Sequence, residues 1–245
     1  MMRIYHTSDL HDHRDFADPL IARRQAAPGW YFDCGDSLRG SQTVYFSDEP
    51  IQRALIRAGC DAQAIGNREF HYLFGALDAR AKRARHPLIC SNLTDVRGRQ
   101  LPFADHLRLS NEHGSVYVAA LLVMQYPTGS LWERVFGWRF LDPEAVIARH
   151  ASAVRDDEYF VVLSHLGLQR DQQLAAAAQR IDLLLGGHSH DTLAQPRVVG
   201  RVPIVHAGPY GRFASVTELH RDDRGRARVS DFELAPLIAG PKHGV

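Results

Sequence analysis

The sequence is poor in cysteine. Among its 245 residues there are only three cysteines, Cys34, Cys60 and Cys90, and no two of them form a Cys-x-x-Cys pair. An odd count without that spacing favours free thiols over a disulfide framework. Each cysteine lies in or directly after an apolar segment with the pattern of a strand. We therefore expect three buried free thiols in a reducing compartment.

Long apolar runs are also missing. No stretch reaches the roughly 18 consecutive apolar residues of a transmembrane helix. The first residues, Met1 to His6, continue directly into polar sequence without the charged and then apolar segments of a signal peptide. The sequence thus predicts a soluble, cytoplasmic protein that has no membrane partner.

A strong charge imbalance is absent as well. The formal net charge is +1, with 23% charged and 45% hydrophobic residues, so the composition indicates neither disorder nor a general affinity for nucleic acid. The length suits one α/β domain. We expect this domain to occupy residues 1–238, followed by a loose tail at 239–245 that is rich in glycine and proline.

Hydrophobic patterning predicts alternating strands and helices in the first part of the chain and additional β-hairpins. Strands are expected at 3–8, 30–34, 61–65, 87–90, 158–163, 181–185 and 202–205, helices at 16–25, 49–58, 73–85, 142–154 and 171–180, and hairpins over 106–123, with a turn at 111–114, and 213–234. Residues 94–105 are expected to be irregular, and 124–141 to form a loop and a candidate lid. This order favours an α/β fold with two packed sheets and outer helices.

Potential metal ligands follow several of the predicted strands. The clearest example is Gly186-Gly187-His188-Ser189-His190, after the apolar run 181–185. Taken alone, a His-x-His pair is more often an ordinary loop feature than a ligand pair. Matching residues at other strand ends change that interpretation, and the full set is Asp9, His11, Asp36, Asn67, His165, His188 and His190. Because ligands of α/β proteins gather at the carboxyl ends of strands, we expect these seven side chains to converge.

Seven mixed oxygen and nitrogen donors exceed what one tetrahedral zinc ion requires. Two ions that share a carboxylate would use them. Such ions, about 3.5 to 4 Å apart, can bind a bridging hydroxide and hold phosphoryl oxygens for in-line displacement. The four imidazoles favour manganese, iron or zinc over magnesium or calcium, and manganese is our first expectation.

In order, Asp9-x-His11, Gly35-Asp36, Gly66-Asn67, His165 and Gly187-His188-x-His190 resemble the motifs of calcineurin-like metallophosphoesterases. The sequence is most similar to the catalytic domain of bacterial 5′-nucleotidases and 2′,3′-cyclic nucleotide phosphodiesterases, and the resemblance covers nearly the whole chain. It implies a four-layer αββα sandwich of two mixed sheets flanked by helices. It further implies one ion held by Asp9, His11, Asp36 and His190 and a second held by Asp36, Asn67, His165 and His188, so that Asp36 bridges them.

The chain departs from the family pattern near the expected site. Arg68 stands where the family has the histidine of Gly-Asn-His-Glu, and His71 stands where nucleotidase-like members have an aspartate. Arginine cannot donate a proton at neutral pH but can hold a phosphate. We hypothesise that Arg68 binds the phosphoryl group and that His71 serves as general acid, with a purely structural His71 as the alternative. Asp12 replaces a glycine of the family pattern, and the 245 residues contain no counterpart of the C-terminal domain that supplies base-stacking aromatics in secreted nucleotidases.

Two further candidates lie in secondary matches to the family. Asn92, in Ser91-Asn92-Leu93, and His206, at the end of the strand 202–205, are expected to contact substrate, although His206 could instead support a ligand. We expect Asp33 to be a hydrogen-bonding residue at a strand end rather than a ligand.

The sequence thus predicts a dinuclear phosphoesterase acting on a small phosphomonoester, with a nucleotide as the expected substrate. One alternative is a phosphodiesterase acting on cyclic nucleotides or nucleic acid ends. A second is a catalytically silent scaffold for protein binding, against which the complete ligand set argues. A metallo-β-lactamase-type hydrolase would need a His-x-His-x-Asp-His cluster, which is not found. The oligomeric state is left open.

Overall fold

A computed structural model describes residues 1–112 and 114–238, and it contains two six-stranded sheets packed face to face. The first sheet has the order β14 (Ala227–Pro236), β13 (Phe213–Arg221), β1 (Met2–Thr7), β2 (Trp30–Asp33), β3 (Ala62–Ala64) and β4 (Leu88–Ile89). The second has the order β11 (Arg197–Val199), β12 (Val202–His206), β10 (Leu183–Gly186), β9 (Glu158–His165), β7 (Gly114–Leu122) and β6 (His106–Asn111). Both sheets are mixed: β1 to β4 run parallel in the first and β7, β9, β10 and β12 in the second, with antiparallel strands outside them.

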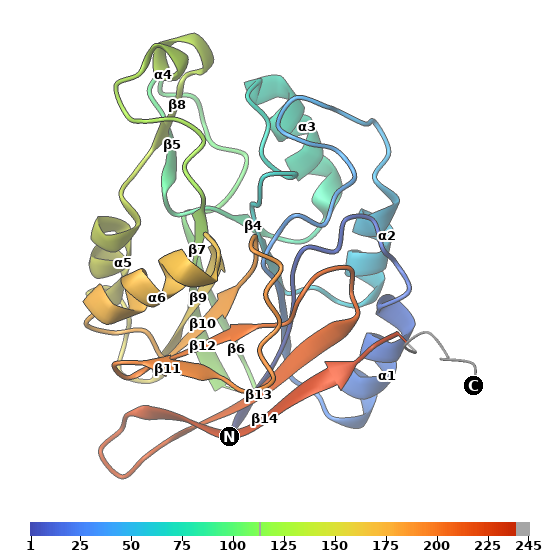
Figure 1. Cartoon of the computed structure of the whole chain (residues 1–245), viewed down its shortest axis with the longest axis vertical. Helices are drawn as coiled ribbons and strands as arrows, with labels where there is room; N and C mark the ends of the chain where they lie inside the picture. Colours follow the sequence, from blue (N-terminus) through green and yellow to red (C-terminus); the bar gives the residue numbers. More distant parts are fainter. Residues whose placement is uncertain (113, 239–245) are drawn as a thin grey trace.

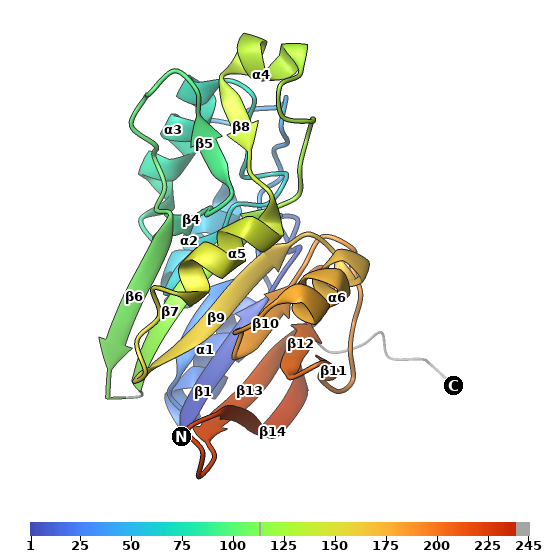
Figure 2. The same cartoon turned by 90° about the vertical axis from the view of Figure 1, so that its left-hand side faces the viewer.

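Helices cover the outer faces of the two sheets. The helices α1 (Ala17–Ala26) and α2 (Pro50–Arg57) lie on the first sheet, with α3 (Phe74–Ala84) beyond the β4 edge, while α5 (Pro143–Ala151) and α6 (Leu168–Ala177) lie on the second (Figures 1 and 2). Asp142 caps α5 as its sequence predicts, because its carboxylate accepts the N–H of Ala145 at 2.9 Å. The described residues contain no helix long and apolar enough to cross a membrane.

Alternation of side chains along the strands builds three apolar layers. Ile4 of β1 and Phe32 of β2 point between the sheets, where they meet Val118 and Leu185 of the second sheet. Tyr5, the residue after Ile4 on β1, and Tyr31 of β2 face α1 and α2 instead. A third cluster joins the second sheet to α5 and α6. The predicted four-layer αββα sandwich is therefore confirmed.

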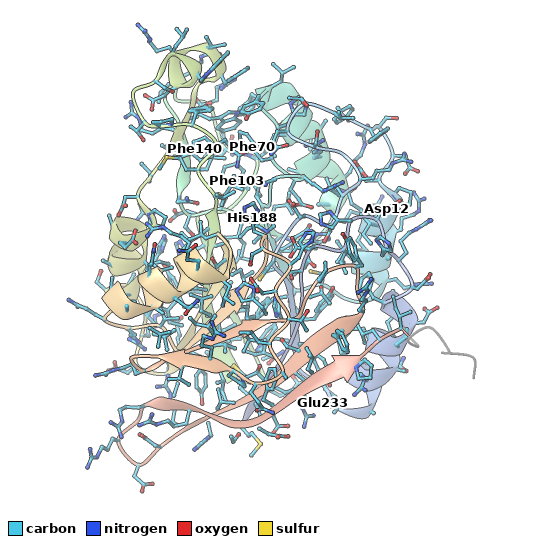
Figure 3. The ribbon with its side chains drawn as sticks, viewed as in Figure 1. Asp12, Phe70, Phe103, Phe140, His188 and Glu233 are labelled. Carbon is cyan, nitrogen blue, oxygen red and sulfur yellow. The ribbon has the colours of Figure 1, made fainter. Side chains whose placement is uncertain are left out.

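The prediction of a loop over 124–141 is wrong. This segment contains α4 (Leu131–Phe136) and β8 (Trp138–Phe140), and β8 pairs with β5 (Leu93–Asp95) in a separate two-stranded sheet. Trp138 and Phe140 are buried against Phe70, which comes from a distant part of the sequence. Figure 3 shows Phe70, Phe103 and Phe140 gathered in the upper part of the molecule. Local sequence did not reveal this structure because its stability comes from these long-range aromatic contacts.

Smaller differences concern element ends. The helix predicted at 171–180 lies at Leu168–Ala177, and β11 was not predicted. The region 94–105, expected to be irregular, begins inside β5. The three cysteines are free and buried, as predicted. The predicted tail at 239–245 and His113 of the predicted turn at 111–114 lie outside the described residues.

Candidate metal centre

The predicted ligands lie at the carboxyl ends of five strands: His165 is the last residue of β9, and the others lie in the loops that follow β1, β2, β3 and β10. Backbone hydrogen bonds tie these loops together: the N–H of Asp9 donates to the carbonyl of Gly35 at 2.9 Å, and that of His11 to Asp36 at 3.0 Å. Across the sheets, the N–H of His188 lies 3.1 Å from both carboxylate oxygens of Asp9. The packing of the two sheets therefore joins ligands that are far apart in sequence. Figure 3 places His188 near the middle of the molecule and Asp12 toward α2.

Two glycines before His188 allow this close approach. A Cβ atom on Gly187 would lie 3.0 Å from the Cβ of Ser8 and 3.1 Å from Oδ2 of Asp9. One on Gly186 would lie 2.0 Å from Nε2 of His206. Neither glycine has the positive φ that only glycine adopts readily, so backbone conformation does not explain them. The lack of space for a side chain explains both glycines.

The ligand atoms form two overlapping groups. Asp9, His11 and His190 make one group and Asp9, Asp36 and His165 the other, and within each the potential donor atoms lie within 4.8 Å of one another. The Nε2 atoms of His11 and His190 are 2.9 Å apart. Asp9 belongs to both groups, whereas the sequence predicts that Asp36 is shared. The bridging role of Asp36 stays a prediction.

Asn67 and His188 complete the set. The amide nitrogen of Asn67 lies 3.4 Å from Nδ1 of His188, and the His188 ring lies 5.0 Å from that of His165, centroid to centroid. All seven predicted ligands are thus brought together at one edge of the stacked sheets.

His165 is poised to coordinate a cation. It is fully buried, and its Nδ1 lies 2.7 Å from the carbonyl oxygen of Cys34, to which it donates. When the ring is neutral, as cation binding requires, this hydrogen bond leaves its lone pair on Nε2, which faces Oδ1 of Asp36 at 3.3 Å. A buried imidazole nitrogen between carboxylates is an arrangement that a divalent cation satisfies. The residues present therefore fit the metal ions that the sequence predicts.

Mutual electrostatic effects are strong at this site. Burial by itself lowers the pKa of His165, but the carboxylates of Asp36 and Asp9 raise it to about 9. Burial opposes ionisation of Asp36, yet His165 lowers the pKa of that carboxyl to about 2. The pKa of His11 falls to about 4 through burial and the nearby Arg68 guanidinium. Burial raises the pKa of Asp9, so of these two buried carboxyls only Asp36 is stabilised in its charged form, through its contact with His165.

Glu69 supports the ligand loops and was missed from the sequence. Its buried carboxylate accepts backbone N–H groups from Asp36 at 2.7 Å, Ser37 at 2.9 Å and Gly66 at 3.0 Å. Burial and the charge of Asp36 raise the pKa of Glu69 to about 7. The signal was present in the motif Gly66-Asn67-Arg68-Glu69, in which Glu69 lies two residues after the predicted ligand Asn67. Glu69 holds the loops that carry Asp36 and Asn67 in place.

Gln125 is a second residue that was missed. Its Nε2 donates to Oδ1 of Asn67 at 3.1 Å, and its Oε1 accepts from Gln42 at 3.1 Å. Gln125 lies in the segment interpreted as a loop, so no local pattern marked it. It orients the amide of Asn67.

Arg68 lies beside the ligands. Its backbone N–H donates to Oδ1 of Asp36 at 2.7 Å, and its guanidinium donates to the carbonyls of Leu38 at 3.3 Å and Arg39 at 3.2 Å. Together with His11, Asp36 and Asn67 it lines a hollow of about 470 Å³. The guanidinium is thus positioned next to the hollow into which the ligands open.

His71 is held apart from the ligands. Its ring is buried at the start of α3, and its Nδ1 accepts the N–H of Leu73 at 3.0 Å. Burial, with a smaller effect of Arg80, lowers the pKa of His71. Within the described residues it makes no hydrogen bond, ion pair or ring contact with Arg68 or a predicted ligand. These contacts agree better with the structural alternative, and the role of general acid stays a prediction.

The structure does not support substrate contact by Asn92 or His206. Asn92 is buried. Its Nδ2 donates to the carbonyl of Leu122 and its Oδ1 accepts the N–H of Leu122, both at 2.8 Å. His206 is buried too, with Nε2 2.8 Å from Oδ2 of Asp171. Both were expected at the site because they lie in secondary matches to the family, His206 also at a strand end, but their side chains point into the protein. Asp33 is a hydrogen-bonding residue as expected, accepting from Thr7 at 2.7 Å and Ser37 at 2.7 Å.

Comparison with known proteins decides the family. The profile of the calcineurin-like phosphoesterases matches residues 2–192, which include all seven predicted ligands. The chain belongs to the calcineurin-like phosphoesterase family. The expectation from the sequence is therefore confirmed at this level.

Relatives within the calcineurin-like phosphoesterases include proteins with named activities. The chain is 30% identical over 243 residues to the uncharacterized metallophosphoesterase YunD of Bacillus subtilis, covering 92% of this chain and 51% of that protein. It is 26% identical over 224 residues to a snake venom 5′-nucleotidase of Gloydius brevicauda, covering 79% and 37% respectively. The chain thus spans about half or less of the length of these relatives.

Solved structures share the fold of this calcineurin-like phosphoesterase. The 5′-nucleotidase precursor of Thermus thermophilus superposes with a TM-score of 0.75 at 23% identity, covering 96% of this chain and 54% of that one. YfkN of Bacillus subtilis, titled a calcineurin-like phosphoesterase, superposes with a TM-score of 0.74 at 18% identity, covering 96% and 90%.

Proposed function

We propose that this protein is a dinuclear metal-dependent phosphomonoesterase that acts on a nucleotide. The observation that carries the proposal is the convergence of the buried Asp9, Asp36 and His165 with His11 and His190 at one sheet edge. The 5′-nucleotidases among its relatives support the choice of a nucleotide. We further propose residues 1–238 as one catalytic domain. A cytoplasmic location stays a prediction that rests on sequence composition.

The seven ligands would hold two divalent ions. Manganese is proposed first, with iron or zinc as alternatives, since imidazole and carboxylate donors suit all three. When bound, such ions supply a nucleophile from water at neutral pH and neutralise phosphoryl charge.

The chain itself contributes positioning and charge. The N–H of Arg68 holds Oδ1 of Asp36, and Gln125 orients Asn67. We assign phosphoryl binding to the Arg68 guanidinium, which would exchange its hydrogen bonds to the carbonyls of Leu38 and Arg39 for phosphoryl oxygens. Because Arg68 cannot give up a proton, the leaving group has no sure general acid, and good leaving groups should react fastest.

The test measures metal content and hydrolysis together. Purified protein loaded with manganese is assayed on AMP, p-nitrophenyl phosphate and bis-p-nitrophenyl phosphate, before and after treatment with EDTA. We expect about two ions per chain, faster hydrolysis of the monoesters and loss of activity with the chelator. Preferential hydrolysis of the diester would favour the phosphodiesterase instead. A protein that binds metal but hydrolyses none of the three would contradict the proposal and favour the silent scaffold.

A further inference from the structure

The hollow beside the ligands has a second wall that the proposed chemistry does not use. His11, Asp36, Asn67 and Arg68 line this space of about 470 Å³, and residues of the loop 39–46, which we call the second wall, line it with them. Its volume lies within the range of small-molecule sites. A phosphate ester whose phosphoryl group lay at the ligands would extend its leaving group along this loop.

The second wall presents a flat, partly exposed surface. The guanidinium carbon of Arg39 lies 4.4 Å from the ring centroid of Phe46, and Phe46 is 37% exposed. Val44, which lines the same hollow, is 47% exposed. Single exposed apolar residues are ordinary. Here they line one space with a stacked guanidinium and the predicted metal ligands, and aromatic and guanidinium planes are the groups on which bases stack.

A buried arginine holds the loop in this conformation. Arg80 is 1% exposed, and its guanidinium donates to the carbonyls of Ser41 at 2.9 Å and Val44 at 2.6 Å on the loop. It also donates to the carbonyl of Phe70 at 2.7 Å, three residues after Asn67 in the sequence. The loop is thereby tied to the segment that carries a predicted ligand.

A buried carboxylate fixes the first residues of the loop. Glu49 accepts the N–H groups of Arg39 and Gly40, both at 3.1 Å. A Cβ atom on Gly40 would lie 2.6 Å from Nη2 of Arg80 and 2.9 Å from Oε1 of Glu49. Such packing around a surface loop is typical of a preorganised binding wall, because a loop ordered before binding loses less entropy when ligand arrives.

We propose that Arg39 and Phe46, within the loop of residues 39–46, form the leaving-group subsite, in which the planar base of a nucleoside monophosphate stacks on Phe46 beside Arg39. This inference rests on the proposed function, because it assumes that the phosphoryl group lies at the ligands. It assigns selection of the base to a loop of this domain.

The experiment compares AMP with ribose 5-phosphate, which differs from it only in lacking the base. In the manganese-loaded full chain, Phe46→Ala should lower the ratio of kcat/KM for AMP to that for ribose 5-phosphate roughly tenfold, the scale of one base–aromatic stack. Phe46→Leu, which keeps an apolar side chain without the ring, should lower the ratio as well, and Phe46→Trp should preserve it.

Tyr45→Ala is the matched control. Tyr45 is the adjacent aromatic, but its hydroxyl accepts a hydrogen bond from Arg83 and its side chain does not line the hollow. The ratio should therefore stay at the wild-type value. An unchanged ratio in Phe46→Ala, or an equal fall in Tyr45→Ala, would overturn the subsite while leaving the phosphomonoesterase intact. If the wild type hydrolyses neither ester, the proposed function fails and the subsite falls with it.

Discussion

The two ends of the stacked sheets differ in backbone conformation. Eight non-glycine residues of the described chain have positive φ, and all but Arg85 lie at the edge that carries the ligands. They are Asp9, His11, Asp12, Asp36, His188, His190 and Tyr210. At the opposite end, a hollow of about 860 Å³ is lined by several arginines, and the residues of its lining with positive φ are the glycines Gly200 and Gly225.

This difference distinguishes the polar residues of the predicted metal site from polar residues whose contacts stabilise the fold. Left-handed backbone in non-glycine residues is uncommon and persists where surrounding structure enforces it, as at functional sites. At the arginine-lined end the contacts are ordinary: Arg180 donates to the carbonyl of Val154 at 3.2 Å and Arg221 to that of Glu158 at 2.7 Å. We infer that the ligand edge is shaped by the requirements of binding and the other end by those of stability. Four substitutions test this contrast.

The largest effect is expected for Asp36→Asn. Asparagine tolerates the left-handed backbone at this position, φ 57°, and keeps an acceptor for the N–H of Arg68. It removes the negative charge that would face the cations, so kcat/KM for AMP should fall about a thousandfold or more. Kinetic assays with manganese, metal analysis and circular dichroism check this. Near-normal activity in a folded, metal-loaded variant would show that Asp36 is not a ligand.

A smaller loss is expected for Glu69→Gln. One oxygen that accepts backbone N–H groups becomes an amide that cannot accept them, so the loops that carry Asp36 and Asn67 should loosen. Residues that support metal ligands typically contribute about 10- to 100-fold to activity or metal affinity. The readouts are kcat/KM and manganese affinity by titration. Wild-type values for both would contradict the supporting role.

His86, which is not a predicted ligand, should affect stability. It lies just before β4, with Nε2 2.8 Å from Oε1 of Gln63, and burial lowers its pKa to about 4. Below about pH 6.5, the ordinary pKa of histidine, His86 becomes protonated in the unfolded chain, whereas in the folded chain it stays neutral until the pH nears 4. The titration of His86 therefore does not affect the free energy of unfolding above pH 6.5. As the pH falls from 6.5 toward 4, it lowers that free energy by up to about 1.4 kcal/mol per pH unit.

Urea unfolding at pH 7, 5.5 and 4.5 measures this slope. His86→Gln, which removes the titrating ring, should flatten the dependence relative to wild type. Identical slopes in wild type and His86→Gln would remove His86 as the source.

The smallest effect is expected for Arg201→Ala. Arg201 is exposed in the turn between β11 and β12 and lines the hollow far from the ligands. Surface replacements of this kind usually change stability by no more than about 0.5 kcal/mol. We expect kcat/KM within twofold of wild type and an unchanged melting temperature. A large loss of activity would break the proposed division between the two ends.

Sequence reasoning succeeded where the information was local. Side-chain chemistry and its position after an apolar run were enough to select Asp9, Asp36 and His165, and the order Asp142-Pro143 was enough to start α5. It failed where partners are distant. The strand β8 owes its burial to Phe70, and Gln125 owes its role to Asn67, so neither segment carries a readable pattern by itself.

By itself, the sequence determined which side chains have the chemistry of metal ligands and that each lies at or just after a strand end, because residue type and hydrophobic period are properties of short segments. Only the tertiary structure decided that residues 9 and 190 meet, that Asn92 and His206 turn inward, and that Phe46 lines the same hollow as Asn67. Those outcomes depend on how two sheets pack and on which buried groups find partners, and these energies exist only once the whole chain has folded.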